Sequence, residues 1–211
     1  AHRLTRALCA GGLLTQDPES DRYQLGPLLV VLGRMAEERL GVARALPHLR
    51  RLADETGESV NLGIRAGGDV LVVADAASPQ PLRFNQASGS RVPVHTSAMG
   101  KCLLAASGDV RGAVSSLPRL DPVTPRTITD RRRLQDELET VGRRGWALND
   151  EERNPGVRAV AVPVAHRGRV VAALAVQGPT LRLPDDRLPD LVERLAATAA
   201  AVAPVLGAGV G

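Results

Sequence analysis

The alternation of apolar and polar residues predicts helices near both ends of the chain and a sheet of hairpins between them. Near the start, Leu4 and Leu8 recur at helical spacing, and the glycine pair that begins at Gly11 ends this predicted helix. The segments Leu13–Gln16 and Arg22–Leu25 flank a stretch rich in turn-forming residues. A helix followed by a two-stranded hairpin is therefore expected at this end.

A longer helical pattern follows the hairpin. Pro27 suits a first helical turn, and Thr56-Gly57 suits a helix end. Between them the apolar positions fall on two successive stripes, with an interruption near Gly41. The first stripe holds Leu28, Leu32, Met35 and Ala36, and the second holds Leu46, Leu49, Leu52 and Ala53. We place a domain boundary at Leu40–Gly41.

The remaining pattern mixes strands and helices. Residues 58–77 form the clearest hairpin, because alternating apolar residues lead into and out of a Gly67-Gly68-Asp69 turn. Strands that arrive as hairpins, with helices between them, predict an α+β fold with an antiparallel sheet. Further strands are expected at Leu82–Gln86, Trp146–Leu148, Val157–Ala165 and Val170–Gln177, and helices at Ser97–Ala106, Asp109–Ser116, from the N-cap Asp130 to Gly145, and Asp185–Leu206.

Two segments carry most of the candidate chemistry. Arg91–Leu104 combines a strand-like run, a polar turn and the start of a helix with small residues, and Gly145–Val164 holds an acidic turn between two strands. If they meet in space, helix N-terminal amides would line one wall of a pocket, as in sites that bind anions, and polar side chains the other.

These two segments, in this order, resemble the effector-binding domain of IclR-family bacterial transcriptional regulators. The resemblance extends through Pro125–Asp130 and Val170–Pro179, and His2–Leu14 with Asp21–Gly26 looks like the recognition helix and wing of that family's winged helix-turn-helix. It implies a partial winged helix over residues 1–26 that lacks its N-terminal helices, a linker helix over 27–40, and a GAF/PAS-like effector domain over 41–211, with an antiparallel sheet flanked by helices.

The resemblance also implies a ligand site. Relatives that bind glyoxylate or pyruvate carry a cysteine and two serines where this chain has Ala159, Ala175 and Gln177. Asn149 stands where an aspartate is common, so an amide that can also donate replaces a carboxylate. These differences favour an effector larger or less polar than glyoxylate. The candidate ligand-binding residues are Phe84, Val92, Ala98, Met99, Gly100, Asn149, Val157, Ala159, Ala175 and Gln177.

At the other end, the resemblance implies contacts with a double-stranded DNA operator. Arginines there can read guanine or bind phosphate. A homodimer or homotetramer would present paired readers to a pseudo-palindromic site. The chain is thus interpreted as a transcriptional regulator, which could be a repressor or an activator. Two alternative functions remain: an enzyme that acts on a small molecule, and a sensor or dimerisation module on the same scaffold. The candidate DNA-binding residues are His2, Arg3 and Arg6 on the helix and Arg22 and Tyr23 on the wing.

Composition narrows these functions further. Aromatic residues make up 1% of the chain, which argues against nucleic-acid binding by base stacking. The net charge of +4 rests almost wholly on arginine, which a GC-rich genome explains as well as DNA binding does. Cys9 and Cys102 lie far apart and predict two buried thiols in a reducing compartment. With no membrane-length apolar run and no signal peptide, we expect a cytoplasmic protein.

Catalytic and metal-binding motifs are absent from the sequence, so no enzyme activity, cofactor or metal is expected. The run His95-Thr96-Ser97 with Asp150 has the residue types of a triad, but the simpler interpretation gives His95 a place in the turn or at the pocket rim. A lone histidine is a poor zinc site, even with acidic neighbours. The acidic run at 150–152 is a solvated turn in the simplest interpretation, whereas the resemblance places this turn at the mouth of the pocket. The arginine run at 131–133 is expected to lie on a solvated helix face.

Overall fold

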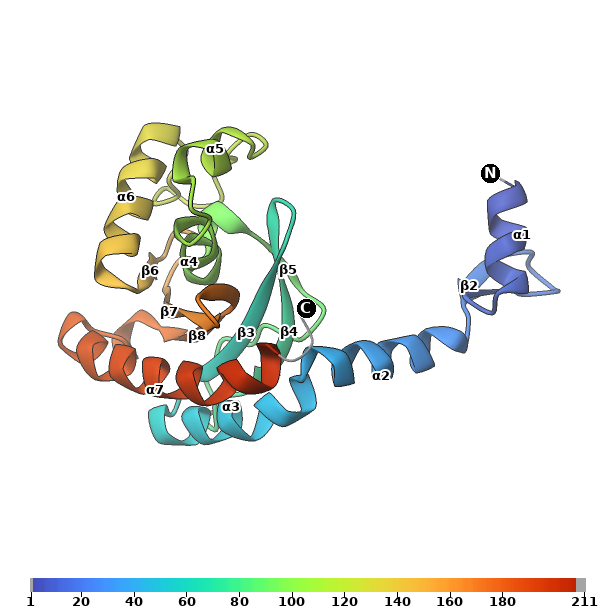
Figure 1. Ribbon diagram of the computed structural model, residues 1–211, viewed down its shortest axis with the longest axis horizontal. Helices are drawn as coiled ribbons and strands as arrows, with labels where there is room; N and C mark the ends of the chain where they lie inside the picture. The colour runs from blue at the N-terminus through green and yellow to red at the C-terminus, as the bar shows by residue number, and fades with distance from the viewer. Residues whose placement is uncertain (1, 208–211) are drawn as a thin grey trace.

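The computed structural model describes residues 2–207 and shows an α+β molecule of two unequal parts (Figure 1). The small N-terminal part consists of α1 (His2–Ala10) and a hairpin of β1 (Leu14–Gln16) and β2 (Tyr23–Leu25). Helix α2 (Leu28–Leu40) extends from it toward the larger body. The predicted helix and hairpin are thus confirmed.

The expected break in the long helical segment lies at Gly41. This residue has φ 72° and separates α2 from α3 (Val42–Thr56). A side chain is disfavoured at this φ, and a Cβ would also overlap the backbone carbonyl of Val205. Arg44 donates to the same carbonyl oxygen at 3.1 Å. The sharp turn therefore seats the start of α3 against the C-terminal helix.

The body is built on one antiparallel sheet with the strand order β5-β4-β3-β8-β7-β6. Asn61 lies opposite Ala175 in the centre of this sheet, where β3 pairs β8. The strands are β3 (Ser59–Ala66), β4 (Asp69–Ala76), β5 (Arg91–Pro93), β6 (Ala147–Asp150), β7 (Val157–His166) and β8 (Arg169–Pro179). The predicted antiparallel α+β class is confirmed.

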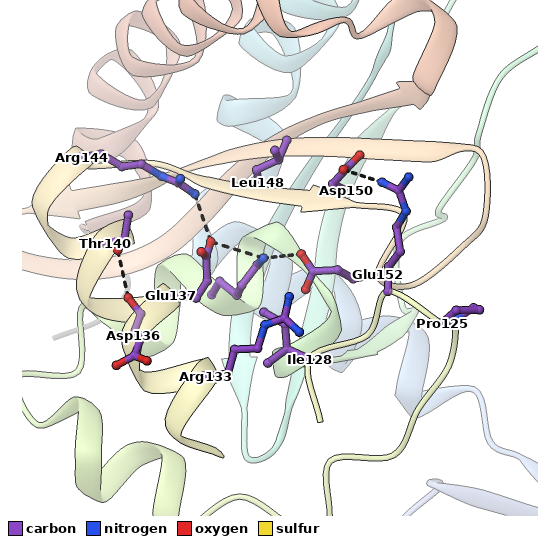
Figure 2. A pocket seen from close by; sticks show the side chains of 12 residues that line it. Pro125, Ile128, Arg133, Asp136, Glu137, Thr140, Arg144, Leu148, Asp150 and Glu152 are labelled. Carbon is purple, nitrogen blue, oxygen red and sulfur yellow. Dashed lines mark hydrogen bonds and ion pairs between the residues drawn. The ribbon is translucent and has the colours of Figure 1, made fainter. Parts of the chain in front are cut away.

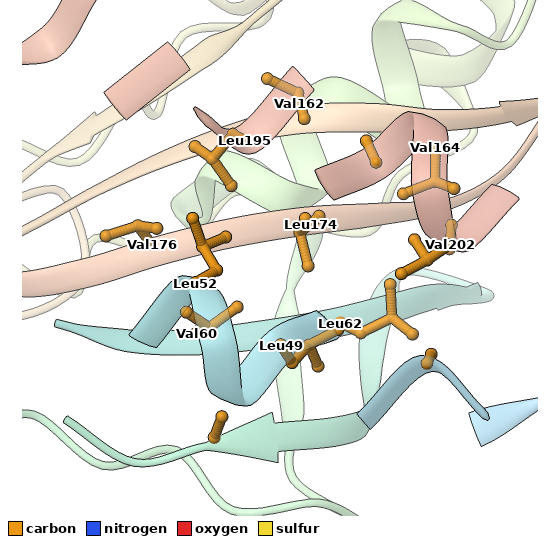
Figure 3. Close-up of a cluster of buried hydrophobic side chains, with 14 of the residues drawn as sticks. Leu49, Leu52, Val60, Leu62, Val162, Val164, Leu174, Val176, Leu195 and Val202 are labelled. Carbon is orange, nitrogen blue, oxygen red and sulfur yellow. The ribbon is translucent and has the colours of Figure 1, made fainter. Parts of the chain in front are cut away.

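Helices cover both faces of the sheet (Figure 1). Helices α3 and α7 (Leu188–Gly207) pack on one face over an aliphatic core that includes Leu49, Leu62 and Leu195 (Figure 3). On the other face lie α4 (Ala98–Ala105), α5 (Val110–Ser115) and α6 (Arg131–Arg144), over a second core. Short 3-10 turns at Val94–Thr96, Thr180–Arg182 and Asp185–Arg187 connect these elements.

Helix α6 was predicted from its cap residues and apolar spacing, and the structure shows why these local signals were sufficient. The side chain of Asp130 accepts a hydrogen bond from the Arg133 backbone amide at 2.8 Å, which satisfies an otherwise unpaired donor of the first turn. At the other end Gly145 has φ 81°, a conformation typical of helix C-termini. Leu134 and Leu138 are buried between these ends, as their spacing predicts.

The predicted strand at Leu82–Gln86 is wrong. The segment has no regular structure, and Leu82 is 72% exposed. The edge of β4 pairs instead with β5, with Leu71 opposite Arg91. The segment is held from the side, where the amide of Asn61 donates to the Gln86 backbone oxygen at 2.7 Å. Tertiary contacts thus override its alternating pattern.

Three smaller expectations also need correction. The last α-helix begins at Leu188, because Asp185–Arg187 form a 3-10 turn. Leu4 is 69% exposed rather than part of a buried stripe. Arg131 is half-buried rather than fully solvated, because its guanidinium donates to the backbone oxygens of Leu117 and Pro118, just after α5. Within residues 2–207, no helix is long and apolar enough to cross a membrane.

Candidate functional site

A cavity lies where the N-terminus of α4, the β6–β7 turn, the ends of β7 and β8, and the irregular segment before β5 meet. It brings together all of the predicted ligand-binding residues except Val92 and Gly100. Its lining is mainly apolar and amide-bearing, with arginine as its one charged residue type. The lining residues are Phe84, Gln86, Ser97, Ala98, Met99, Asn149, Arg153, Asn154, Val157, Ala159, Ala175 and Gln177.

Val92 and Gly100 have structural positions behind this cavity. Val92 is fully buried in the core beneath α4. A Cβ on Gly100 would overlap the backbone of Val94, so glycine allows α4 to pack against the preceding turn. The Gly100 amide is also engaged, because it donates to Ser97 Oγ at 3.0 Å. Neither residue contributes to the cavity lining.

The cavity is nearly closed. Its volume is about 20 Å³, which is room for roughly one water molecule. Phe84 and Gln86 line it from the irregular segment, and Met99 lines it from α4. A ligand of several heavy atoms therefore requires lining side chains to move.

Several polar groups at the cavity are already engaged by the protein. Asn149 donates to the Thr96 backbone oxygen at 3.0 Å, and its side-chain oxygen accepts from the Glu152 amide at 2.9 Å. The side-chain nitrogen of Gln177 donates to Asn61. These amides hold the walls of the cavity in place.

The side chains of Gln86, Arg153 and Asn154 have donors at the cavity without such partners in the described part of the chain. The side-chain nitrogen of Gln86 is buried and makes no hydrogen bond. Arg153 is half-buried, and no hydrogen bond or ion pair engages its side chain in the described part of the chain. Burial lowers the pKa of Arg153, opposed by the charge of Asp69. Neither Gln86 nor Arg153 was selected from the sequence: Gln86 ends the segment that was predicted as a strand, and Arg153 lies in a turn, where only its charge beside the acidic run was visible.

A buried ion pair supports the wall from behind. Lys101 Nζ lies 2.5 Å from Glu152 Oε1 and 3.6 Å from Glu137 Oε1, and Arg144 pairs with Glu137 at 3.1 Å (Figure 2). Burial raises the pKa of Glu152, against the opposing effect of the Lys101 charge. The acidic turn is therefore not simply solvated. This chain of charges fastens α4, the turn and α6 together.

These charges border a second hollow, of about 670 Å³, between α6 and the acidic turn (Figure 2). Arg126 pairs there with Asp150 at 2.6 Å, and the Lys101 chain lines its inner side. The hollow is larger than the closed cavity, but it is open and its charges largely neutralise one another. A small-molecule site needs enclosure and an apolar lining, which the closed cavity provides better.

The residues that resembled a triad do not assemble. His95 is buried, with Nε2 3.2 Å from the backbone oxygen of Asp121. The Ser97 hydroxyl caps α4, and Asp150 pairs with Arg126 and Arg158. Across residues 2–207, no cluster of three or more histidine, cysteine or acidic residues could hold a metal ion.

The predicted DNA-binding residues gather on the small N-terminal part. Arg3 and Arg6 are exposed on α1, and Arg22 and Tyr23 are exposed at the hairpin. His2 begins α1, but its side chain lies outside the described residues. The structure thus places a basic helix and a hairpin tip on one small unit.

A sensor-like domain with an interior cavity, joined through one long helix to a helix-and-hairpin unit, defines a ligand-responsive regulator. The family described as "Bacterial transcriptional regulator IclR C-terminal" matches residues 38–203. The chain belongs to the IclR family of bacterial transcriptional regulators, and its C-terminal part is the effector-binding domain of that family.

Individual relatives agree with this assignment. The chain is 38% identical to the HTH-type transcriptional regulator BhcR of Paracoccus denitrificans, over 89% of this chain and 68% of that protein. It is also 38% identical to the glycerol operon regulatory protein of Streptomyces griseus, over 99% and 84%. A solved IclR homologue from Microbacterium hydrocarbonoxydans, complexed with 4-hydroxybenzoate, matches with a TM-score of 0.80 at 26% identity, over 98% and 85%. These relatives are transcriptional regulators.

Proposed function

We propose that this regulator binds a small carboxylic acid with an apolar portion in the closed cavity, and that this acid modulates its operator binding. The observation that carries the proposal is the lining of the cavity: alanine and valine side chains on β7 and β8 form an apolar floor, and the first two residues of helix α4, Ala98 and Met99, form part of the wall. An acid larger than glyoxylate uses both features. The 4-hydroxybenzoate complex of the Microbacterium homologue supports the same class of ligand.

We propose that residues 1–26 are part of the DNA-reading domain, residues 27–40 are the linker helix and residues 41–211 are the effector domain. The exposed arginines of α1 and the hairpin support this division. The regulator acts on the operator without catalysing a reaction on its effector. It works in the cytoplasm, where bacterial DNA is located.

Dimerisation is part of the same proposal. Not one residue of α2 is buried in the single chain, although Leu28, Val31 and Met35 lie on one stripe of the helix. A second copy packed along this stripe would remove these apolar side chains from water. A symmetric dimer then presents two readers to a pseudo-palindromic operator.

The DNA-binding part is tested by footprinting and salt titration of the full-length protein. Arg3→Ala or Arg6→Ala is expected to weaken operator binding by roughly 1–3 kcal/mol if the arginine reads a base, and to lower the salt slope if it binds phosphate. Arg119→Ala, an exposed arginine on the effector domain, is the matched control. If both α1 variants bind with unchanged affinity and unchanged salt dependence, these arginines lie outside the interface.

A further inference from the structure

The cavity has an excess of hydrogen-bond donors that no protein acceptor satisfies. Its lining contains one arginine and no aspartate or glutamate. Ser97 and Asn149 each already accept a hydrogen bond from a backbone amide. Besides the backbone amides at the start of α4, the side-chain donors that remain belong to Arg153, to Asn154 and to the side-chain nitrogen of Gln86, and among them only the Gln86 nitrogen is fully buried and only Arg153 is charged. A ligand that fills this site is therefore required to bring acceptors.

Gln86 is an independent indication of a ligand. The residue is 8% exposed, and its side-chain nitrogen is buried without any partner. Buried polar groups in folded proteins nearly always have a hydrogen-bond partner, so an unpaired one in a cavity calls for an explanation. The Gln86 backbone is fixed by Asn61 at 2.7 Å, which holds the residue at the cavity while its own amide remains unused.

Arg153 is the one charged residue among the described residues that line the cavity. In the described part of the chain, the opposing charge that acts on it is Asp69, and that carboxylate is itself bound by Arg91 at 3.1 Å. Neighbouring arginines differ in this respect: Arg126 and Arg158 both pair with Asp150. Arg153 is thus a half-buried guanidinium without a counter-ion of its own, at the wall of a closed cavity.

We infer that Arg153 is the counter-ion of the effector's carboxylate and that Gln86 donates the second hydrogen bond to it. This inference rests on the proposed function, since it assumes that the effector occupies this cavity. A guanidinium binds a carboxylate through two parallel hydrogen bonds, and a neutral amide or ester cannot match that charge. The two residues therefore select an acid over its neutral analogues, and the apolar floor selects the rest of the molecule.

The test compares matched acids and amides by calorimetry and thermal shift: benzoate with benzamide, and hexanoate with hexanamide. The wild-type protein is expected to bind at least one acid about 10- to 100-fold more tightly than its amide, the range set by hydrogen bonds to a charged group. Arg153→Gln is expected to remove this preference. Arg126→Gln, whose arginine lies at the other hollow, is expected to keep it.

Gln86→Met separates a ligand-binding role from a structural one. It keeps the side-chain length but removes the unpaired donor, so the variant without ligand is expected to unfold at the same or a higher temperature than the wild type. In the presence of the acid its thermal shift is expected to be smaller than that of the wild type. A lower unfolding temperature without ligand, together with unchanged acid binding, would show that Gln86 serves the fold alone.

The remaining outcomes separate the inference from the proposed function. If acid and amide bind equally, or if Arg153→Gln retains the acid preference, the roles of Arg153 and Gln86 are refuted while an effector site remains. If neither benzoate nor hexanoate binds the wild-type protein, the proposed function is itself refuted for aromatic and for medium-chain acids.

Discussion

At the residue scale, the site depends on groups whose environment differs from what their sequence context suggests. Lysine is usually a surface residue, yet Lys101, near the start of α4, is 1% exposed and paired to Glu152. Gln86 ends a segment with the alternation of a strand, and Arg153 follows an acidic run; only the meeting of these two distant segments brings both residues to one cavity. Ala98 and Met99 could be predicted because they belong to a continuous segment that resembles a family motif.

The buried pair makes Lys101 a determinant of stability. Lys101→Met is expected to lower the free energy of unfolding by about 3–5 kcal/mol, because it leaves the carboxylate of Glu152 buried without its counter-ion. Urea denaturation measures this loss. The double variant Lys101→Met/Glu152→Leu should recover much of it, since it removes both charges. Arg126→Gln at the exposed pair with Asp150 should change stability by less than about 1 kcal/mol. If Lys101→Met and Arg126→Gln lower the free energy of unfolding equally, the buried pair of Lys101 and Glu152 has no special role in stability.

The two cysteines are expected to differ in reactivity. Burial raises the pKa of Cys102 to about 12, and its thiol donates to the Ala161 backbone oxygen at 3.2 Å. At pH 8 roughly one thiol in ten thousand is then ionised, and the thiolate is the reactive form. Iodoacetamide should therefore label the half-buried Cys9 first, and Cys102 only on unfolding. Mass spectrometry of the wild type and of Cys9→Ser checks this; rapid labelling of Cys102 in the native protein would refute it.

At the element scale, the structure shows which sequence signals were sufficient. The β3–β4 hairpin and α6 were predicted because their turn and cap residues act locally. The segment Leu82–Gln86 was predicted wrongly because its alternation is the same as that of a strand, and pairing with β4 is decided by the competing segment Arg91–Pro93. Its irregular path is what brings Phe84 and Gln86 to the cavity. The least predictable element is thus part of the candidate site.

Helix α2 is predicted to be a dimer contact. Val31→Glu combined with Met35→Glu places two charges on its exposed apolar stripe and is expected to convert a dimer into a monomer. Multi-angle light scattering at micromolar concentration measures this. Gly33→Glu adds a charge elsewhere on α2, at a position with open space, and is expected to leave the dimer intact. A wild-type protein that is strictly monomeric would rule out α2 as a dimer contact.

At the scale of the whole molecule, the structure offers a physical connection between the cavity and the N-terminal helix-and-hairpin unit, which we propose to be part of the DNA-reading domain. Asn61 on β3 binds both Gln177 and the Gln86 backbone at the cavity. Helix α3 packs on the same sheet, and its first turn meets α7 at Gly41, where α2 departs. A ligand that moves the segment with Gln86 would act on this connection. It shifts operator affinity only if it binds two arrangements of the molecule unequally.

The coupling between the cavity and the operator is measured by operator affinity across a titration of the tightest-binding acid. For the full-length wild type, we expect saturating acid to change operator affinity by about 5- to 150-fold, the usual range of coupling between two sites. Ala175→Val, which adds only two methyl groups to the cavity floor, is expected to bind the operator normally but to respond to the acid only at a higher concentration. Saturable binding of the acid with no change in operator affinity, or the same acid response in the wild type and Ala175→Val, would contradict control of DNA binding by this cavity.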